Sequence, residues 1–327
     1  MTRRYFYFHN GRYGEGREDL PELADQEVLV ETTRSLVSVG TETACNTGAS
    51  GWAVGRHGYS NVGIVTRMGG SISEAGDVSS GDRVFSAEIH TDRYHSPPDK
   101  LYVLPDDVTD EQAAFISLGA VAVHVVERAE IKMGQPVVVV GQGTVGQIVQ
   151  QLARLAGGGR IVGVDLDAGR RDLALAFGAD AAVPPDAGVL AEALAAPFRH
   201  APPPVFMEVT ASAKAAEWIF DTAPLHARVV LASAYTAACS FDPNLIVRKE
   251  LMVIGAHQPK CPQRPVPYYP YSRELNYTFI LEQIRSGGLK VDELYDALIT
   301  PEQLLDFYGA VERGRRDLRQ PIIKWRT

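Results

Sequence analysis

The sequence has little cysteine and no long hydrophobic run. Its three cysteines, Cys45, Cys239 and Cys261, lie far apart, so we expect no disulfide framework and no cysteine pair with metal-ligand spacing. No segment approaches the roughly 20 apolar residues of a membrane span, and residues 1–9 lack the apolar core of a signal peptide. We therefore expect a cytoplasmic protein with no membrane partner.

An excess of positive charge is also missing. The chain has 32 Lys and Arg against 40 Asp and Glu, a formal net charge of −8. Nucleic-acid-binding proteins need a basic stripe, so a nucleic-acid partner is not expected. The 327 residues are too many for one compact core and predict two domains.

Two kinds of pattern follow one another along the chain. Residues 1–118 are typical of a β-rich domain, with strands predicted at 27–32 and 63–68, a turn at 81–82 that leads into another strand, and a helix capped at Thr109 or Asp110. Strands and helices then alternate: strands at 136–140, 160–165, 205–209, 228–232 and 252–255, and helices at 143–156, 168–177 and 213–221. This alternation predicts an α/β fold with a doubly wound parallel sheet. Beyond a loop rich in Pro and Tyr at 260–273, we expect helices at 275–285 and 301–313 and a strand at 321–325.

A glycine-rich turn, Gly141-Gln-Gly143-Thr144-Val145-Gly146, joins the first of these strands to its helix. Gly141 permits the tight turn, Gly143 lets the backbone approach a pyrophosphate, and Gly146 lets the helix pack on the sheet. The helix N-terminus then offers N–H groups and partial positive charge to the phosphates. The alternative is a purely structural turn.

Asp165 ends the second strand of the alternating region. A carboxylate there accepts the adenosine ribose hydroxyls and repels the 2′-phosphate of NADP, which favours NAD. Arg170 and Arg171 keep NADP open as the alternative, because an arginine nearby can hold that phosphate.

The ordered motifs together resemble the medium-chain dehydrogenase/reductase superfamily, which includes the zinc alcohol dehydrogenases. The resemblance covers essentially the whole chain and rests on residues 104–108, 133–135, 141–146, 161–165, 177–180 and 250–255. It implies a GroES-like catalytic domain from residues 1–118 and 273–327, with a Rossmann domain at 119–272, and it implies a homodimer. It also implies cofactor contacts at Thr210, Ala211, Ser233, Ala234 and Ala256, although ordinary packing at strand ends would explain these residues too.

The resemblance breaks down at the zinc ligands. Family members with catalytic zinc carry Cys-Gly-Thr-Asp in a first loop and Gly-His-Glu in a second. Here the first loop is Val39-Gly-Thr41-Glu42 and the second is Gly58-Tyr59-Ser60, and residues 114–118 hold no third ligand. The four-cysteine structural lobe is absent as well. Because a zinc site needs three protein ligands, we expect no zinc.

Without a metal, a side chain must handle the proton of the reaction. By family position, Tyr59 faces the cleft in place of the lost histidine, and His90 lies near the substrate pocket with a suitable ordinary pKa. Thr41 and Glu42 occupy the places of a hydroxyl relay and an acid. The alternatives are a tyrosine that fills the vacated space, a structural histidine and an acid that holds its loop. His57 is expected to be structural.

The resemblance and these residues predict a zinc-independent, NAD(H)-dependent oxidoreductase acting on a polar secondary alcohol, such as a sugar or cyclitol, and its ketone. The polar residues Glu42, His90, Tyr94, Arg273 and Asn276 suggest that substrate class. One alternative is a zinc-free quinone or enoyl reductase using NADPH. Another is a non-catalytic dinucleotide-binding sensor or assembly subunit.

Overall fold

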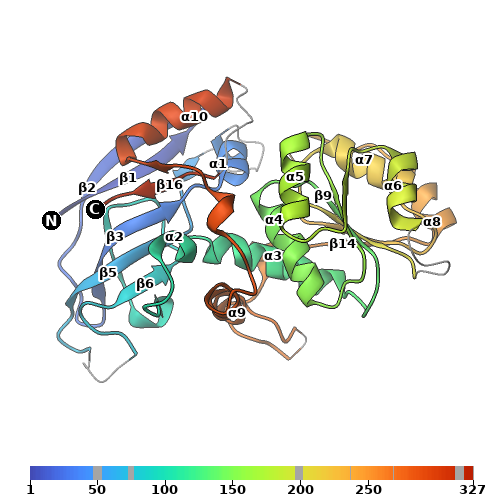
Figure 1. The fold of residues 1–327 in the computed structure, drawn as a ribbon. Helices are drawn as coiled ribbons and strands as arrows, with labels where there is room; N and C mark the ends of the chain where they lie inside the picture. Colours follow the sequence, from blue (N-terminus) through green and yellow to red (C-terminus); the bar gives the residue numbers. More distant parts are fainter. Residues whose placement is uncertain are drawn as a thin grey trace. The chain divides into compact units, whose positions relative to one another are not determined.

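The computed structural model describes residues 1–46, 54–72, 77–195, 202–235, 237–267, 269–313 and 320–326. The chain divides into two compact units, Met1–Leu118 with Leu281–Thr327, and Gly119–Ile280 (Figure 1). The first unit resumes at Leu281, whereas the sequence analysis expected its return at residue 273. Helix α9 (Arg273–Arg285) begins in the second unit and ends in the first. In the second unit, Ile280 of this helix packs on Gly119. A Cβ on Gly119 would lie 2.6 Å from Cγ2 of Ile280. Within these ranges no helix combines the length and apolar character that a membrane crossing requires.

The first unit is built from two sheets (Figure 1). Their strands are β1 (Thr2–His9), β2 (Arg12–Asp19), β3 (Val28–Leu36), β4 (Val54–Arg56), β5 (Asn61–Met68), β6 (Arg83–Ser86), β7 (Arg93–Ser96), β8 (Tyr102–Val103), β15 (Leu298–Ile299) and β16 (Ile322–Lys324). The smaller sheet has the order β2-β1-β4. The larger has the order β15-β16-β3-β5-β6-β8, with β7 also paired to β3. The C-terminal β16 therefore completes a sheet that the N-terminal segment begins.

The helices of this unit are α1 (Val39–Asn46), α2 (Asp110–Ala113) and α10 (Leu304–Glu312), and α3 (Ile116–Ala129) crosses into the second unit. The predicted cap at Thr109 is confirmed, since its hydroxyl accepts the Gln112 N–H and the Gln112 side chain accepts the Thr109 N–H. The segment at 39–42 is helical and is not the loop that the family motif implied. Its first turn is closed by the Glu42 N–H, which donates to the Ser38 carbonyl at 2.9 Å.

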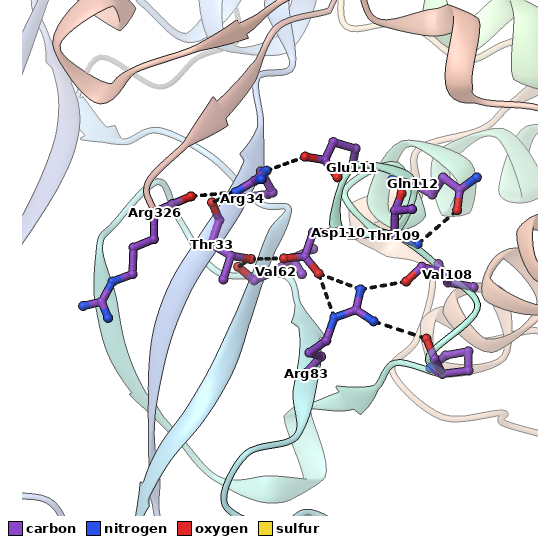
Figure 2. Close-up of polar contacts among 11 residues, drawn as sticks. Thr33, Arg34, Val62, Arg83, Val108, Thr109, Asp110, Glu111, Gln112 and Arg326 are labelled. Carbon is purple, nitrogen blue, oxygen red and sulfur yellow. Dashed lines mark hydrogen bonds and ion pairs between the residues drawn. The ribbon is translucent and has the colours of Figure 1, made fainter.

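A polar network fixes α2 against the larger sheet (Figure 2). The Asp110 carboxylate accepts from the Arg83 guanidinium of β6 at 2.6 and 2.9 Å, and from the Thr33 hydroxyl of β3 at 2.5 Å. Arg34, also on β3, donates to Glu111 at 2.6 Å. Because these groups are half-buried or buried, leaving any of them unpaired would be costly, and the network holds the start of the helix in one position.

The second unit is the predicted doubly wound fold, which is confirmed. Its six-stranded sheet has the order β11-β10-β9-β12-β13-β14, and every neighbouring pair is parallel. The strands are β9 (Val137–Val140), β10 (Ile161–Val164), β11 (Ala181–Val183), β12 (Val205–Glu208), β13 (Arg228–Leu231) and β14 (Met252–Gly255). The helices α4 (Thr144–Leu155), α5 (Ala168–Ala176), α6 (Ala187–Ala195), α7 (Ala213–Thr222) and α8 (Asn244–Lys249) lie between them in the chain (Figure 1). The strand order reverses between β9 and β12, and ligands of such sheets bind outside the carboxyl ends of the strands at that point.

Candidate functional site

The glycine turn lies at the carboxyl end of β9, where the strand order reverses. Gly141 has a φ of +99°, and a Cβ there would lie 2.6 Å from Cγ2 of Thr210. A Cβ on Gly146 would overlap the carbonyl oxygen of Gly141. Gly143 is the N-cap of α4, and no described atom lies within 4 Å of where its Cβ would be. Thr144 and Val145 begin the helix, so their N–H groups have no intrahelical partner and are available to phosphate oxygens.

Asp165 lies against the same turn. One carboxylate oxygen accepts the Gln142 N–H at 2.7 Å, and the other accepts the Asp167 N–H at 2.9 Å. The Arg170 guanidinium is 3.8 Å from the carboxylate, while Arg171 donates to the backbone carbonyls of residues 165 and 166 at 2.9 Å. The acidic side chain is thus fixed beside the backbone of the glycine turn, and Arg170 partly balances its charge.

The other predicted cofactor residues follow β12, β13 and β14. Thr210 donates its N–H to Glu208 at 2.6 Å, and Ala211 adopts a left-handed φ of +61°. Ser233 is half-buried and Ala234 is exposed. Ala256 differs from the expectation, because it is 4% exposed and its N–H already donates to the Leu231 carbonyl. Only the carbonyl oxygen of Ala256 is left for a cofactor amide.

Sequence reasoning missed Glu208 and Tyr235 at this edge of the sheet. Glu208 ends β12 and is fully buried. Its carboxylate accepts the N–H and hydroxyl of Thr210, and it accepts the Tyr235 hydroxyl at 2.5 Å. The signal was present in the sequence, since a glutamate that closes an apolar strand is a rare buried charge.

In the first unit, Tyr59 is the half-buried residue at the position of the lost histidine. Its hydroxyl donates to Ser38 Oγ at 2.6 Å. Burial raises the pKa of Tyr59 to about 12, although hydrogen bonds to Ser38 and Thr41 oppose the rise. The phenol therefore keeps its proton at neutral pH and acts as a donor. Thr41 is exposed on α1.

Glu42 is the centre of a buried polar cluster. It is 3% exposed and accepts the Ser38 N–H at 2.7 Å, His90 Nε2–H at 3.3 Å and the Tyr308 hydroxyl. Burial alone would raise the pKa of Glu42, but the contacts with His90 and Tyr308 outweigh it and hold the pKa well below its usual value. No motif of the sequence pointed to Tyr308, which lies on α10.

His90 does not fit the predicted role of proton carrier. Its side chain is fully buried, and its two ring nitrogens contact Glu42 and, at 2.9 Å, Ser35 Oγ. A ring so enclosed positions the Glu42 carboxylate and has no face left for a substrate. Tyr94 and Asn276 are also buried, so they do not supply the polar lining that suggested a sugar-like substrate.

His57 packs within a group of aromatic rings, as a structural histidine would. Its ring centroid lies 4.8 Å from Phe8, 5.3 Å from Tyr13 and 5.1 Å from Tyr308. Neither ring nitrogen has a hydrogen-bond partner among the described residues. Burial lowers the pKa of His57 to about 4, and the nearby Glu42 charge only partly opposes this. The ring is neutral at pH 7.

Comparison with known proteins finds a family model that matches part of the second unit. Residues 144–267 match the family model described as zinc-binding dehydrogenase. D-xylulose reductase A of Aspergillus niger is 38% identical over 92 residues, which is 28% of this chain and 26% of that protein. The matched stretch thus spans about a quarter of the length of that curated relative.

Solved structures match over the full length. A putative zinc-binding dehydrogenase from Sinorhizobium meliloti 1021 bound to NADP has a TM-score of 0.79 at 20% identity, with 99% of both chains covered. Galactitol-1-phosphate dehydrogenase from Escherichia coli has a TM-score of 0.79 at 17% identity, covering 98% of this chain and 99% of that one. The match over residues 144–267 and the shared fold support the resemblance of the motifs to the medium-chain dehydrogenase/reductase superfamily.

The residues at the positions of the family's zinc ligands do not fit a zinc ion. Val39 at the start of α1 and Ile116 at the start of α3 have no donor atom, and Tyr59 is a protonated phenol. Glu42 and His57 are enclosed in the cluster described above. Across the part of the chain that the structure describes, no group of three His, Cys, Asp or Glu side chains is placed to hold a metal.

The glycine turn gives a matched pair of variants. Gly146→Ala should lower the free energy of unfolding by at least about 1–3 kcal/mol, because its methyl group must displace the Gly141 carbonyl. Gly143→Ala should fold as the wild type does, since its φ of −71° suits alanine, yet bind NAD(H) more weakly because the methyl group fills the phosphate space. Chemical denaturation and calorimetric titration measure both effects. Wild-type stability of Gly146→Ala would contradict the packing argument.

The lowered pKa of His57 predicts a loss of stability in mild acid. The folded state resists protonation of this ring down to about pH 4, whereas the unfolded chain takes up the proton near the ordinary pKa of 6.5. The contribution of the neutral His57 ring to the free energy of unfolding is fully present above pH 6.5. It should fall by up to roughly 3 kcal/mol as the pH drops to 4. His57→Phe should flatten this part of the curve, and His9→Phe, at an exposed strand end, should not. Equal slopes for the wild type and His57→Phe, measured by denaturation at several pH values, would refute the prediction.

Proposed function

We propose that the chain is a zinc-independent, NAD(H)-dependent oxidoreductase that interconverts a polyol-like secondary alcohol and its ketone by hydride transfer. The observation that carries the proposal is the glycine turn, with Asp165 hydrogen-bonded to its backbone, in a chain whose zinc positions hold no ligand set. The substrate class draws on the relatives named D-xylulose reductase and galactitol-1-phosphate dehydrogenase.

The environment of Asp165 supports NAD over NADP. The carboxylate is held at the turn by two backbone N–H groups, so it cannot easily withdraw from a 2′-phosphate. Arg171 is engaged by backbone carbonyls, and the nearby Arg170 is drawn towards Asp165. NADP is the less favoured cofactor, although one similar structure is bound to it.

Tyr59 is proposed to supply the proton when the ketone is reduced. Bound NADH supplies the hydride to the carbonyl carbon. The Tyr59 hydroxyl then donates to the carbonyl oxygen in place of Ser38 Oγ, and because its pKa is about 12, the phenolate that results is promptly protonated again. The exposed Thr41 hydroxyl passes this proton from solvent. In alcohol oxidation the same steps run in reverse.

Glu42 and His90 are proposed as positioning residues for Tyr59. The Glu42 carboxylate accepts hydrogen bonds from the Ser38 backbone N–H and from His90 Nε2–H. Ser38 Oγ in turn accepts the Tyr59 hydroxyl. The orientation of the phenol thus depends on a chain of hydrogen bonds that ends at a buried charge.

A homodimer is proposed through β14. This strand ends the sheet of the second unit, and its Met252 and Val253 are 48% and 38% exposed. Exposed apolar edge strands are usually paired or covered. A 35.5 kDa monomer in sedimentation equilibrium would overturn this proposal.

Activity assays on protein treated with a chelator test the main proposal. We expect NAD⁺-dependent oxidation of pentitols and hexitols to persist after chelation, with less turnover on NADP⁺. Stoichiometric zinc that is lost together with activity would overturn zinc independence. Quinone or enone reduction with NADPH in place of polyol oxidation would overturn the substrate class. Tight cofactor binding without turnover on any substrate would support a sensor or assembly subunit instead.

Tyr59→Phe should reduce kcat by about 10²–10⁴-fold, the usual contribution of a positioned proton donor, with NAD(H) affinity unchanged. Tyr7→Phe removes the same atom from β1 and serves as the control. Wild-type kcat for Tyr59→Phe would show that another group donates the proton.

A further inference from the structure

The two halves of a bound dinucleotide can be assigned to the two sides of the strand reversal, given the cofactor binding proposed above. The glycine turn at the end of β9 holds the pyrophosphate, and Asp165 at the end of β10 marks the adenosine side. The nicotinamide half must then extend over the carboxyl ends of β12 and β13. Glu208, Thr210 and Tyr235 lie there.

Glu208 carries a buried negative charge at this place. Its carboxylate is the acceptor in each of its three hydrogen bonds. The donors are the Thr210 N–H at 2.6 Å, the Thr210 hydroxyl, and the Tyr235 hydroxyl at 2.5 Å. A carboxylate surrounded by donors is in its ionised, acceptor-only form. Burial and the Glu208 charge raise the pKa of Tyr235, so the phenol keeps the proton that it donates.

The charge of Glu208 has no cationic partner in the described part of the chain. None of the ion pairs there includes Glu208. Glu42 differs, because an imidazole lies 3.3 Å from its carboxylate. A buried, uncompensated anion exerts a strong field on its surroundings, since water does not screen it.

The nicotinamide ring is positively charged when oxidised and neutral when reduced. We propose that Glu208, held in place by Thr210 and Tyr235, stabilises the oxidised nicotinamide relative to the reduced one and so biases hydride transfer between the bound molecules towards reduction of the ketone. Glu208 is buried beneath the loop that follows β12, so it acts through its field and not by contact with the reacting atoms. Thr210 and Tyr235 are positioning residues for this charge.

The ratio of the dissociation constants of NAD⁺ and NADH tests the proposal. Glu208→Gln removes the charge, keeps the shape and can still hydrogen-bond Thr210 and Tyr235. We expect the NAD⁺ constant to rise about tenfold relative to that of NADH, the effect of one unit charge several ångströms away in a protein. Glu192→Gln on α6 removes the same charge from an exposed part of the second unit and should leave the ratio unchanged.

The outcomes separate this proposal from the proposed function. If the wild type binds neither NAD(H) nor NADP(H), the proposed function fails. If the wild type binds and Glu208→Gln leaves the ratio of dissociation constants unchanged, this inference alone is overturned. Should Glu208→Gln fail to fold, Tyr235→Phe decides, because loss of its hydrogen bond weakens the hold on the carboxylate. That variant should shift the ratio in the same direction by a smaller factor, and an unchanged ratio would again overturn the inference.

Discussion

The close approach of Gly146 to the carbonyl oxygen of Gly141 is the constraint on which the rest of the cofactor edge depends. There is no room for a side chain between them, so α4 begins directly at the end of β9. That approach brings the N-terminal N–H groups of the helix to the point where the strand order reverses. It also leaves the Gln142 N–H free to hold Asp165, and places Gly141 against Thr210. One backbone contact thus positions both sides of the proposed dinucleotide site.

Features formed by neighbouring residues could be predicted from the sequence. Five of the six strands of the second unit were located to within about a residue, because parallel strands buried on both faces are short continuous apolar runs. The three-residue edge strand β11 was missed. The N-terminal hairpin was missed, although Asn10-Gly11, with φ values of +48° and +78°, is a strong turn signal. Its second strand, β2, is rich in charged residues and glycine and shows no alternation of apolar and polar side chains.

The candidate site could be predicted only in part, for the same reason. The glycine turn, the acidic residue and the zinc positions could each be predicted because each lies in a short motif. The enclosure of His90 and Glu42 could not, because it depends on residues far away in the sequence. These are Tyr308 and Trp325, whose indole N–H donates to Ser35 at 2.9 Å across 290 positions of sequence. A histidine placed by family position alone was therefore assigned to proton transfer when the folded chain uses it to hold a carboxylate.

The two buried carboxylates show how partners decide what a charge can do. Glu42 and Glu208 each accept a backbone N–H and a tyrosine hydroxyl, which offset part of the cost of burial. Glu42 also has an imidazole beside it, so its charge is used within the first unit to fix Ser38 and, through it, Tyr59. Glu208 has hydroxyl and amide donors but no cation among the described residues. Its field is consequently available to a positive charge brought in by a ligand, and an oxidised nicotinamide bound at this edge of the sheet would carry one.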